Sequence, residues 1–300
     1  MSAFMIPEME PNEFILWQSM LERKTGLWLP ETRKAFLVTS LNRHMREKGI
    51  KRYKDFYQLL DSGQVSSLDW ARLVDSLTVH ETCFYRDLDS LNLVTSFCRN
   101  NILKGFQQQP TSVQDLQLWS VGCSTGEETY TLAMEMEKLN LSLRPAQQEL
   151  MYYGVTGIDV SYPSLAVARE GIYSNKNSDF LPSTSFNSFF DRMADNHIQV
   201  KSGIKRRTCF MQANILELEQ EPKQFFDVIY CQNVMIYFRQ ERKAAIIEDF
   251  EKRLKPGGML ILGHGEITSV ANANLTRVDN KHCLAFIKSE RSITNNSELA

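Results

Sequence analysis

The chain has 300 residues, 43% of them hydrophobic, and a formal net charge of −2. This much apolar material predicts two domains with substantial cores, and the near-zero charge excludes a general electrostatic attraction to nucleic acid or anionic lipid. No stretch approaches the roughly 18 apolar residues that span a bilayer, and the first residues lack the basic flank of a signal peptide, so we expect a cytoplasmic protein.

Residues 1–76 are predicted to form a small helical bundle. Apolar side chains recur at helical spacing in residues 14–23, 31–48, 53–60 and 67–77. One stretch of this bundle is basic and contains a single acid, Glu47. Its members are Arg43, His44, Arg46, Lys48, Lys51, Arg52 and Lys54. Such a run is either a solvated helix face or a docking face for an acidic partner.

A glycine turn follows an apolar strand near the middle of the chain. The sequence reads Leu118-Trp-Ser-Val-Gly122-Cys-Ser-Thr-Gly126, and residues 129–138 then have helical character. Glycines let the backbone approach a ligand, and a helix N-terminus offers unpaired N–H groups, as in Rossmann-type cofactor sites. Because the turn lacks the full G-x-G-x-x-G of dinucleotide enzymes, alone it is equally consistent with a tight strand-to-helix connection.

Three later segments read as strands that end in polar residues. They are residues 152–159, 208–214 and 226–233, ending in Asp159, Asn214 and Asn233. An acid after the second strand can bind ribose hydroxyls. Each residue also has a simpler reading, because Asp159 can cap a helix and the two asparagines can satisfy turn backbone. Their joint occurrence with the glycine turn favours a ligand site.

Helices are predicted between these strands, at residues 162–170 and 240–254, and an apolar strand follows at 259–263. This alternation predicts an open, mostly parallel sheet with ligand groups at the strand C-termini. Within the long segment 173–207, residues 197–205 alternate like a strand, with a turn at Ser202-Gly203. The segment is therefore predicted to contribute a small β-element.

The absence of certain motifs limits which cofactors the chain is expected to bind. No G-x-x-x-x-G-K-[ST] string occurs, which argues against a nucleoside triphosphate. A ligand with one adenosine and no pyrophosphate fits better, and S-adenosylmethionine (SAM) is the commonest such cofactor. The six cysteines are scattered and form no C-x-x-C, so neither a metal site nor a disulfide framework is expected.

Five segments together resemble the chemotaxis receptor methyltransferases, the CheR family. They are residues 77–87 (Leu-Thr-Val-His-Glu-Thr-Cys-Phe-Tyr-Arg-Asp), 122–128, 226–238, 254–258 and 263–266. The resemblance implies an α/β class I SAM-dependent methyltransferase fold, Rossmann-like and mostly parallel, with an inserted β-subdomain and an N-terminal helical domain. It further implies transfer of methyl groups from SAM to chemoreceptor glutamates, leaving S-adenosylhomocysteine.

The resemblance also implies domain limits. Residues 1–76 would dock the receptor, 77–90 would link the domains and contribute to the cofactor site, and 91–288 would bind SAM, with the β-subdomain at about 174–207. Residues 289–300 are polar and are expected to be a flexible tail.

Individual site residues follow from the same resemblance. His80, Thr82 and Arg86 would contact SAM from the entry segment, with Gly122 and Glu127 in the glycine loop, Asp159 on the ribose side, Asn214 and Ile215 around the adenine, and Asn233 and Val234 beside the methionine moiety. Arg86 and Tyr237 would orient the substrate carboxylate as catalytic residues. His80 stands where the family more usually has Asn, and spacing does not decide between Glu127 and Glu128.

The expected partners are the acidic cytoplasmic helices of chemoreceptors, bound by a monomer. Some family members also bind a receptor C-terminal peptide by strand addition to the β-subdomain. Here the connection at residues 191–197 is short and lacks glycines, which argues against that tether.

The sequence leaves two alternative functions to be weighed. An amino-directed nucleic-acid methyltransferase would normally carry Asn/Asp-Pro-Pro-Tyr/Phe after the fourth strand, where this chain has Asn233-Val-Met-Ile, and no nucleic-acid partner is expected. A non-catalytic adapter is disfavoured because Arg86, Asp159 and Tyr237 are all present.

Overall fold

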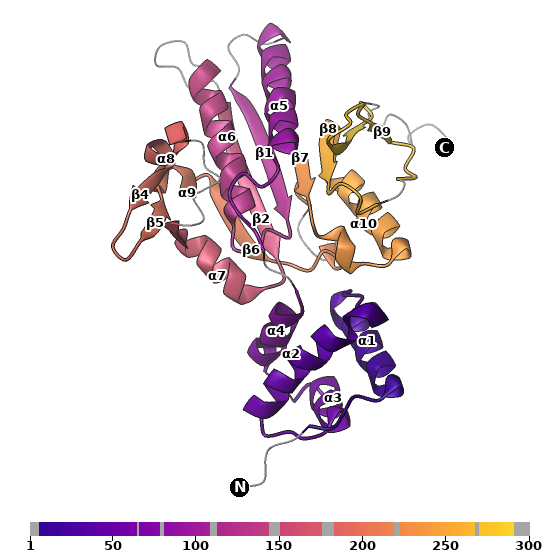
Figure 1. Ribbon diagram of the computed structural model, residues 1–300. Coiled ribbons are helices and arrows are strands. Elements are labelled where there is room, and N and C mark those ends of the chain that lie inside the picture. The colour runs from indigo at the N-terminus through magenta and orange to yellow at the C-terminus, as the bar shows by residue number, and fades with distance from the viewer. Residues whose placement is uncertain are drawn as a thin grey trace.

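The computed structural model describes residues 6–64, 66–78, 81–108, 113–143, 151–175, 183–218, 223–267 and 270–290. Figure 1 shows a helical domain below a larger domain built on a central sheet. The helical domain comprises α1 (Pro11–Thr25), the 3-10 turn η1 (Glu31–Arg33), α2 (Lys34–Glu47), α3 (Tyr53–Asp61) and α4 (Ser67–Leu77). The four helical segments predicted here are confirmed.

Local signals set the limits of α1. The N–H of Glu10 donates to Oε2 of Glu13 at 3.0 Å, a reciprocal cap of the first turn, and the helix ends where Gly26 adopts a φ of +75°. The buried face of α1 packs on α3, with the rings of Trp17 and Phe56 5.5 Å apart. The bundle therefore has an apolar core of its own.

A seven-stranded sheet forms the larger domain, in the order β6-β2-β1-β7-β8-β10-β9. The strands are β1 (Gln114–Val121), β2 (Met151–Asp159), β6 (Thr208–Gln212), β7 (Phe226–Cys231), β8 (Leu254–Leu262), β9 (Leu275–Arg277) and β10 (Leu284–Lys288). The first five in this order pair in parallel, and β10 runs antiparallel to both β8 and β9. The mostly parallel sheet predicted from the sequence is confirmed.

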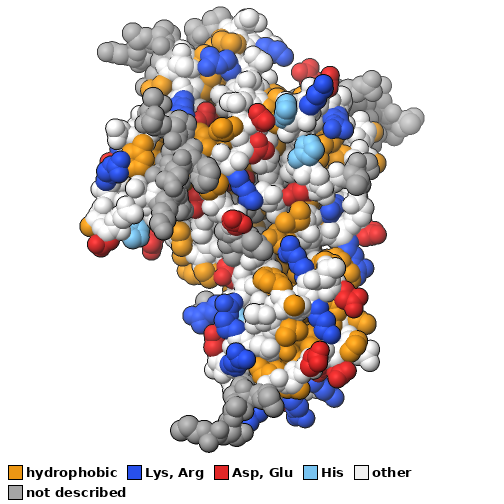
Figure 2. All heavy atoms as spheres, in the orientation of Figure 1, with side chains coloured by type: hydrophobic (Ala, Val, Ile, Leu, Met, Phe, Trp, Pro, Cys, Tyr) orange, Lys and Arg blue, Asp and Glu red, His pale blue; other side chains and the backbone are white. Residues whose placement is uncertain are grey.

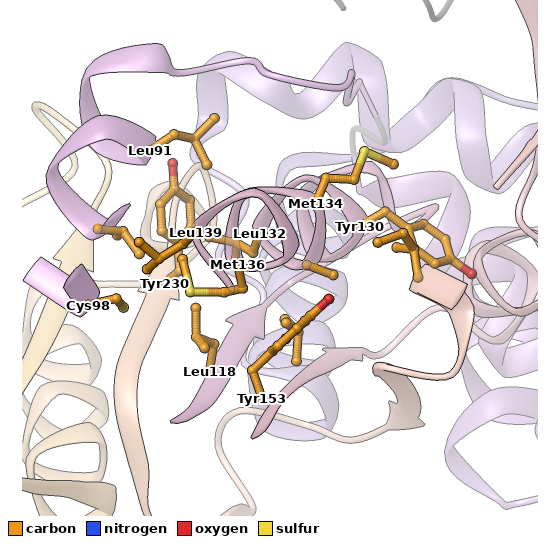
Figure 3. Close-up of a cluster of buried hydrophobic side chains, with 14 of the residues drawn as sticks. Leu91, Cys98, Leu118, Tyr130, Leu132, Met134, Met136, Leu139, Tyr153 and Tyr230 are labelled. Carbon is orange, nitrogen blue, oxygen red and sulfur yellow. The ribbon is translucent and has the colours of Figure 1, made fainter. Parts of the chain in front are cut away.

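Helices cover both faces of this sheet. On one face, α5 (Leu88–Gln108) and α6 (Glu127–Leu143) bury the cluster of Figure 3, in which Cys98 and Leu132 face Leu118. On the other face lies α10 (Gln240–Arg253), whose Phe250 ring is 5.7 Å from that of Trp119. Burial on both faces explains why the strands read as nearly continuous apolar runs. The helix predicted at 162–170 is α7 (Tyr162–Glu170).

A second, antiparallel sheet has the order β3-β5-β4. It comprises β3 (Ile172–Ser174), β4 (Phe190–Arg192) and β5 (His197–Val200), accompanied by α8 (Ser183–Phe189) and α9 (Ser202–Lys205). The predicted strand is β5, which ends at Val200, and the turn predicted at Ser202-Gly203 is the one-turn helix α9. The neighbouring strands β3 and β4 are three residues long, so the backbone beyond Val200 has no ladder to continue, and Lys205 N donates to Lys201 O at 3.1 Å instead.

The end of α10 also differs from the prediction. The helix stops at Arg253, and β8 already begins at Leu254, which pairs with Phe226. The register shifts between Phe226 and Val228, and Gly257 adopts a φ of +74°. Residues 255–258, which were expected to separate the helix from the next strand, therefore form a bulge within β8.

Among the described residues, no helix is both long and apolar enough to cross a bilayer. Ten residues of the predicted tail, 291–300, lie outside the described part of the chain.

Candidate functional site

The polar residues that follow the strands meet at one edge of the sheet. Strand β1 lies between β2 and β7, and the strand order runs outwards in opposite directions from this point. In parallel sheets, the crevice outside the strand C-termini at such a reversal is the usual ligand site. Gly122 follows β1, Asp159 ends β2 and Asn233 follows β7, so all three lie at the crevice.

The glycine turn is held closely against β2 and the β7 loop. The N–H groups of Gly122 and Cys123 both donate to Ile158 O, at 2.8 and 2.9 Å. Gly122 has a φ of +73°, and a Cβ added there would lie 2.3 Å from Cγ2 of Val234. Both the conformation and the close approach require glycine at this position.

Asp159 is a buried carboxylate that accepts two backbone hydrogen bonds. The N–H of Ser124 donates to one oxygen and the N–H of Ser161 to the other, each at 2.8 Å. The cap of α7 is instead Ser161, whose hydroxyl accepts from Ser164 N. The helix-capping reading of Asp159 is therefore wrong, and its carboxylate is fixed at the tip of β2.

The two asparagines are placed differently. Asn233 adopts a φ of +60°, a left-handed conformation that asparagine tolerates better than most residues. Asn214 uses its side-chain oxygen to accept from Leu216 N at 3.0 Å, so it satisfies turn backbone as the simpler reading expected. It also lines the ligand crevice, and the two readings therefore both apply.

Two adjoining hollows occupy the crevice. The first hollow has about 560 Å³ of empty space and is lined by Thr82, Arg86, Asp87, Glu128 and Tyr230, among others. The second hollow has about 650 Å³ and is lined by Asp159, Asn214, Ile215, Val234 and Tyr237, among others. Gly122, Ser124 and Asn233 line both, so the hollows meet there.

Carboxyl groups set the electrostatics of the first hollow. Ser120 Oγ donates to Glu128 at 2.7 Å, and burial raises the pKa of Glu128 to about 8. Burial also opposes ionisation of Asp87, but hydrogen bonds from Ser90 and Gln232 outweigh it and keep the pKa of Asp87 below its usual range. The two acids therefore differ in charge near neutral pH, with Asp87 ionised and Glu128 largely protonated.

Arg86 and Tyr237 line different hollows. Arg86 is exposed in the first, and its Nη1 donates to Glu81 O at 2.8 Å. Tyr237 belongs to η4 (Met235–Tyr237) and lines the second. The two predicted catalytic residues thus flank the junction formed by Gly122, Ser124 and Asn233.

Sequence reasoning missed several lining residues. Thr25 and Leu27 reach the second hollow from the helical domain, where nothing in their own segment signals a ligand, whereas Thr78 belongs to the motif at residues 77–87. Asp87 stands inside the motif at residues 77–87 and was available as a signal.

Two predicted cofactor residues are not placed at the hollows. Glu127 is buried and accepts from Thr125 Oγ1 at 2.6 Å, and it lines neither hollow, whereas its neighbour Glu128 lines the first. His80 lies outside the described residues.

Comparison with known proteins identifies the family. Residues 80–283 match the family described as CheR methyltransferase, SAM binding domain, and residues 12–78 match CheR methyltransferase, all-alpha domain. The chain belongs to the CheR methyltransferase family. The resemblance, the fold class and the SAM cofactor inferred from the sequence are thereby confirmed.

Curated relatives of this CheR methyltransferase cover most of its length. The chemotaxis protein methyltransferase of Borreliella burgdorferi is 28% identical, with 83% of this chain and 86% of the relative covered. Chemotaxis protein methyltransferase 1 of Pseudomonas aeruginosa is 29% identical, with 85% and 89% covered. The chemotaxis protein methyltransferase of Escherichia coli is 28% identical, with 82% and 81% covered.

The crevice fits the cofactor of the family. Val234 packs against the bare backbone of Gly122, the Asp159 carboxylate is anchored at the tip of β2, and the second hollow is walled by apolar and amide side chains. These are the groups that an adenosine with ribose hydroxyls requires.

Proposed function

We propose that this CheR methyltransferase methylates glutamate side chains of chemoreceptors in the cytoplasm, forming methyl esters. The observation that carries the proposal is the junction at Gly122, Ser124 and Asn233, where the hollow of Arg86 meets the hollow of Tyr237. A cofactor whose adenosine lies in the second hollow would extend across this junction into the first, where its methyl group would meet the substrate side chain. The names of the curated relatives support chemoreceptor signalling as the setting.

The chemistry needs little from the protein beyond positioning. SAM supplies an electrophilic methyl group. A glutamate side chain, with a reference pKa of about 4.3, is ionised near pH 7 and needs no general base. Arg86 pairs with the incoming carboxylate and the Tyr237 hydroxyl donates to it, so that its oxygen is aligned for in-line attack.

The other predicted residues hold the cofactor. Asp159 accepts from the ribose hydroxyls, Asn214 and Ile215 enclose the adenine, and Asn233 and Val234 contact the methionine part. Thr82 and His80 contribute from the entry segment. Of the adjacent acids, Glu128 rather than Glu127 faces the cofactor, because it lines the first hollow whereas Glu127 does not.

Receptor docking is assigned to the helical domain. On the face that Figure 2 shows, Lys and Arg side chains of this domain lie among Asp and Glu side chains. Lys48 Nζ lies 2.8 Å from Asp69, and Arg52 Nε lies 2.8 Å from Asp55, so part of the basic run is paired with acids of the same domain. Arg43 is exposed.

The position of the basic run favours a long partner. Asp69, which pairs with Lys48, is in the first turn of α4, whereas Thr78 after the end of α4 lines the second hollow. At 1.5 Å per residue, the nine residues from Asp69 to Thr78 place the Lys48 end of the run about 14 Å from the site along this helix. A receptor helix, about 30 Å long for 20 residues, spans that separation, and we assign this substrate to a monomer of the enzyme.

No peptide tether is included in the proposal. The β4–β5 connection turns through Asp195 and Asn196, with φ values of +55° and +58°, and Met193 N donates to His197 O at 2.9 Å. This is a tight hairpin without glycine, and it offers no extended loop to support an added strand.

The test is transfer of labelled methyl from SAM to a purified cytoplasmic receptor fragment. We expect label that mild base releases, as an ester does, and no label in a fragment whose methylated glutamates are replaced by alanine. Base-stable label, or label that enters RNA in preference to the receptor fragment, would refute the proposal in favour of a different methyltransferase.

A further inference from the structure

Arg239 joins the two domains beside the predicted catalytic tyrosine. Its Nε lies 3.1 Å from Oε1 of Glu22, and its Cζ lies 3.5 Å from the centre of the Trp28 ring. Both partners belong to the helical domain, whereas Arg239 is the residue from which α10 begins. A guanidinium that is both stacked and ion-paired uses its planar shape as well as its charge.

The backbone on either side of this contact is tightly docked. Trp28 N donates to Tyr237 O at 2.8 Å. Gly26 has a φ of +75°, and a Cβ there would lie 2.0 Å from Cδ1 of Leu216 and 3.0 Å from Cε1 of Phe238. The turn at residues 25–28 therefore packs directly on the segment that carries Tyr237.

The same turn is a wall of the site. Thr25 and Leu27 line the second hollow together with Tyr237. Loosening between the turn and Tyr237 would therefore move the tyrosine relative to the wall it faces. The position of Tyr237 depends on a contact between domains and not on its own segment alone.

We propose that Arg239 is a positioning residue that clamps the turn at residues 25–28 against the Tyr237 segment and so fixes Tyr237 for methyl transfer. This inference rests on the proposed function of Tyr237. The Arg239 side chain is 43% exposed, so its ion pair with Glu22 adds little to folding stability. Its effect falls on the position of Tyr237.

Kinetics of Arg239→Ala test the clamp, with Arg242→Ala as the matched control because Arg242 is exposed on the next turn of α10. Arg239→Ala is expected to lower kcat about tenfold, with KM changed less than about twofold. Arg239→Lys is expected to recover little, since lysine lacks the planar fork. In a Tyr237→Phe background, Arg239→Ala should cause no further loss, because it acts through Tyr237.

Amide exchange of Trp28 gives a readout that does not depend on the reaction. The Trp28 N–H is expected to exchange at least about tenfold faster in Arg239→Ala than in Arg242→Ala. If the Trp28 N–H exchanges faster in Arg239→Ala but the parent does not methylate the receptor, the proposed function is refuted and the clamp between the domains is still supported. Unchanged exchange, kcat equal to that of Arg242→Ala, or an undiminished loss in the Tyr237→Phe background would each overturn the clamp.

Discussion

Val234 fills the space that a side chain at Gly122 would need: a Cβ there would lie 2.3 Å from Cγ2 of Val234. Gly122 follows β1 and Val234 lies beyond the end of β7, so the two strands at the reversal of the sheet are in contact through this pair. Both residues line the second hollow. The geometry of the cofactor crevice therefore depends on the absence of one side chain.

Gly122→Ala is expected to impair SAM binding more than folding. The alanine must adopt a φ near +73° and displace Val234 into the hollow, so we expect SAM affinity to fall at least about tenfold and stability by about 2 kcal/mol. Gly49→Ala is the control, because Gly49 has a φ of +70° with open space around it. Calorimetric titration should show parental SAM affinity for Gly49→Ala, and equal affinity in Gly122→Ala would contradict the assigned crevice.

Asp159→Asn should weaken the cofactor while keeping the shape of the side chain. The substitution replaces one acceptor oxygen by a donor that faces the N–H of Ser124 or Ser161, and it removes the charge. A loss of about 1.5 to 3 kcal/mol corresponds to roughly 10- to 150-fold in affinity. Asp115→Asn, at the opposite end of β1, should bind SAM as the parent does. If Asp159→Asn also binds normally, the ribose role is wrong.

The stability of the protein is expected to decrease as the pH rises towards 8. Burial raises the pKa of Glu128 from 4.5 to about 8 and that of Glu266 to about 7. The folded state then holds protons that the unfolded chain releases, so this stability is complete below about pH 4.5 and is lost as the pH passes the folded values. The change in unfolding free energy between pH 5 and pH 8.5 should be roughly 4 kcal/mol smaller in Glu128→Gln than in the parent. The exposed Glu248→Gln should keep the parental slope, and parallel curves for both variants would exclude this role for Glu128.

Sequence reasoning reached those parts of the site whose signals are local to one strand. Asp159, Asn214 and Asn233 each follow an apolar run, and parallel strands bring such ends to one edge. Thr25 and Leu27 reach the second hollow through domain docking, which leaves no periodic signal in their own segment. Glu128 lines the first hollow and Glu127 does not, a difference in side-chain direction that spacing alone cannot give.

The fold shows the same division. The alternation at residues 197–205 matched a strand, but pairing was limited by the length of β3 and β4, and α9 formed where no partner strand was available. The antiparallel strands β9 and β10 at the edge of the sheet were not predicted either. They form by pairing, β10 with β8 and β9 with β10, and not because of a pattern in their own residues. Contacts between distant segments account for these differences.

Tyr237→Phe should lower methyl transfer without loosening the cofactor. If the hydroxyl donates to the substrate carboxylate, its removal costs about 1.5 to 3 kcal/mol in the transfer step, or roughly 10- to 150-fold in kcat. Tyr152→Phe is a suitable control, since Tyr152 is 50% exposed on β2. Single-turnover rates and SAM titrations separate the two effects, and a parental rate for Tyr237→Phe would rule out a role for the hydroxyl.

Charge reversal in the basic run should weaken receptor methylation selectively. Arg43 and Arg46 are exposed on α2, and replacing both with Glu is expected to lower the rate of receptor methylation at low salt about tenfold and to flatten its salt dependence, because exposed charges are screened over about 8 to 10 Å. SAM affinity should stay unchanged, since neither residue lines the hollows. The double variant Arg277→Glu with Lys281→Glu changes the net charge equally from exposed sites on the other domain, and it should methylate the receptor at the parental rate. Equal losses in both variants would indicate a global charge effect, whereas no loss in either would leave the run as a solvated face and move receptor docking to the β3-β5-β4 sheet.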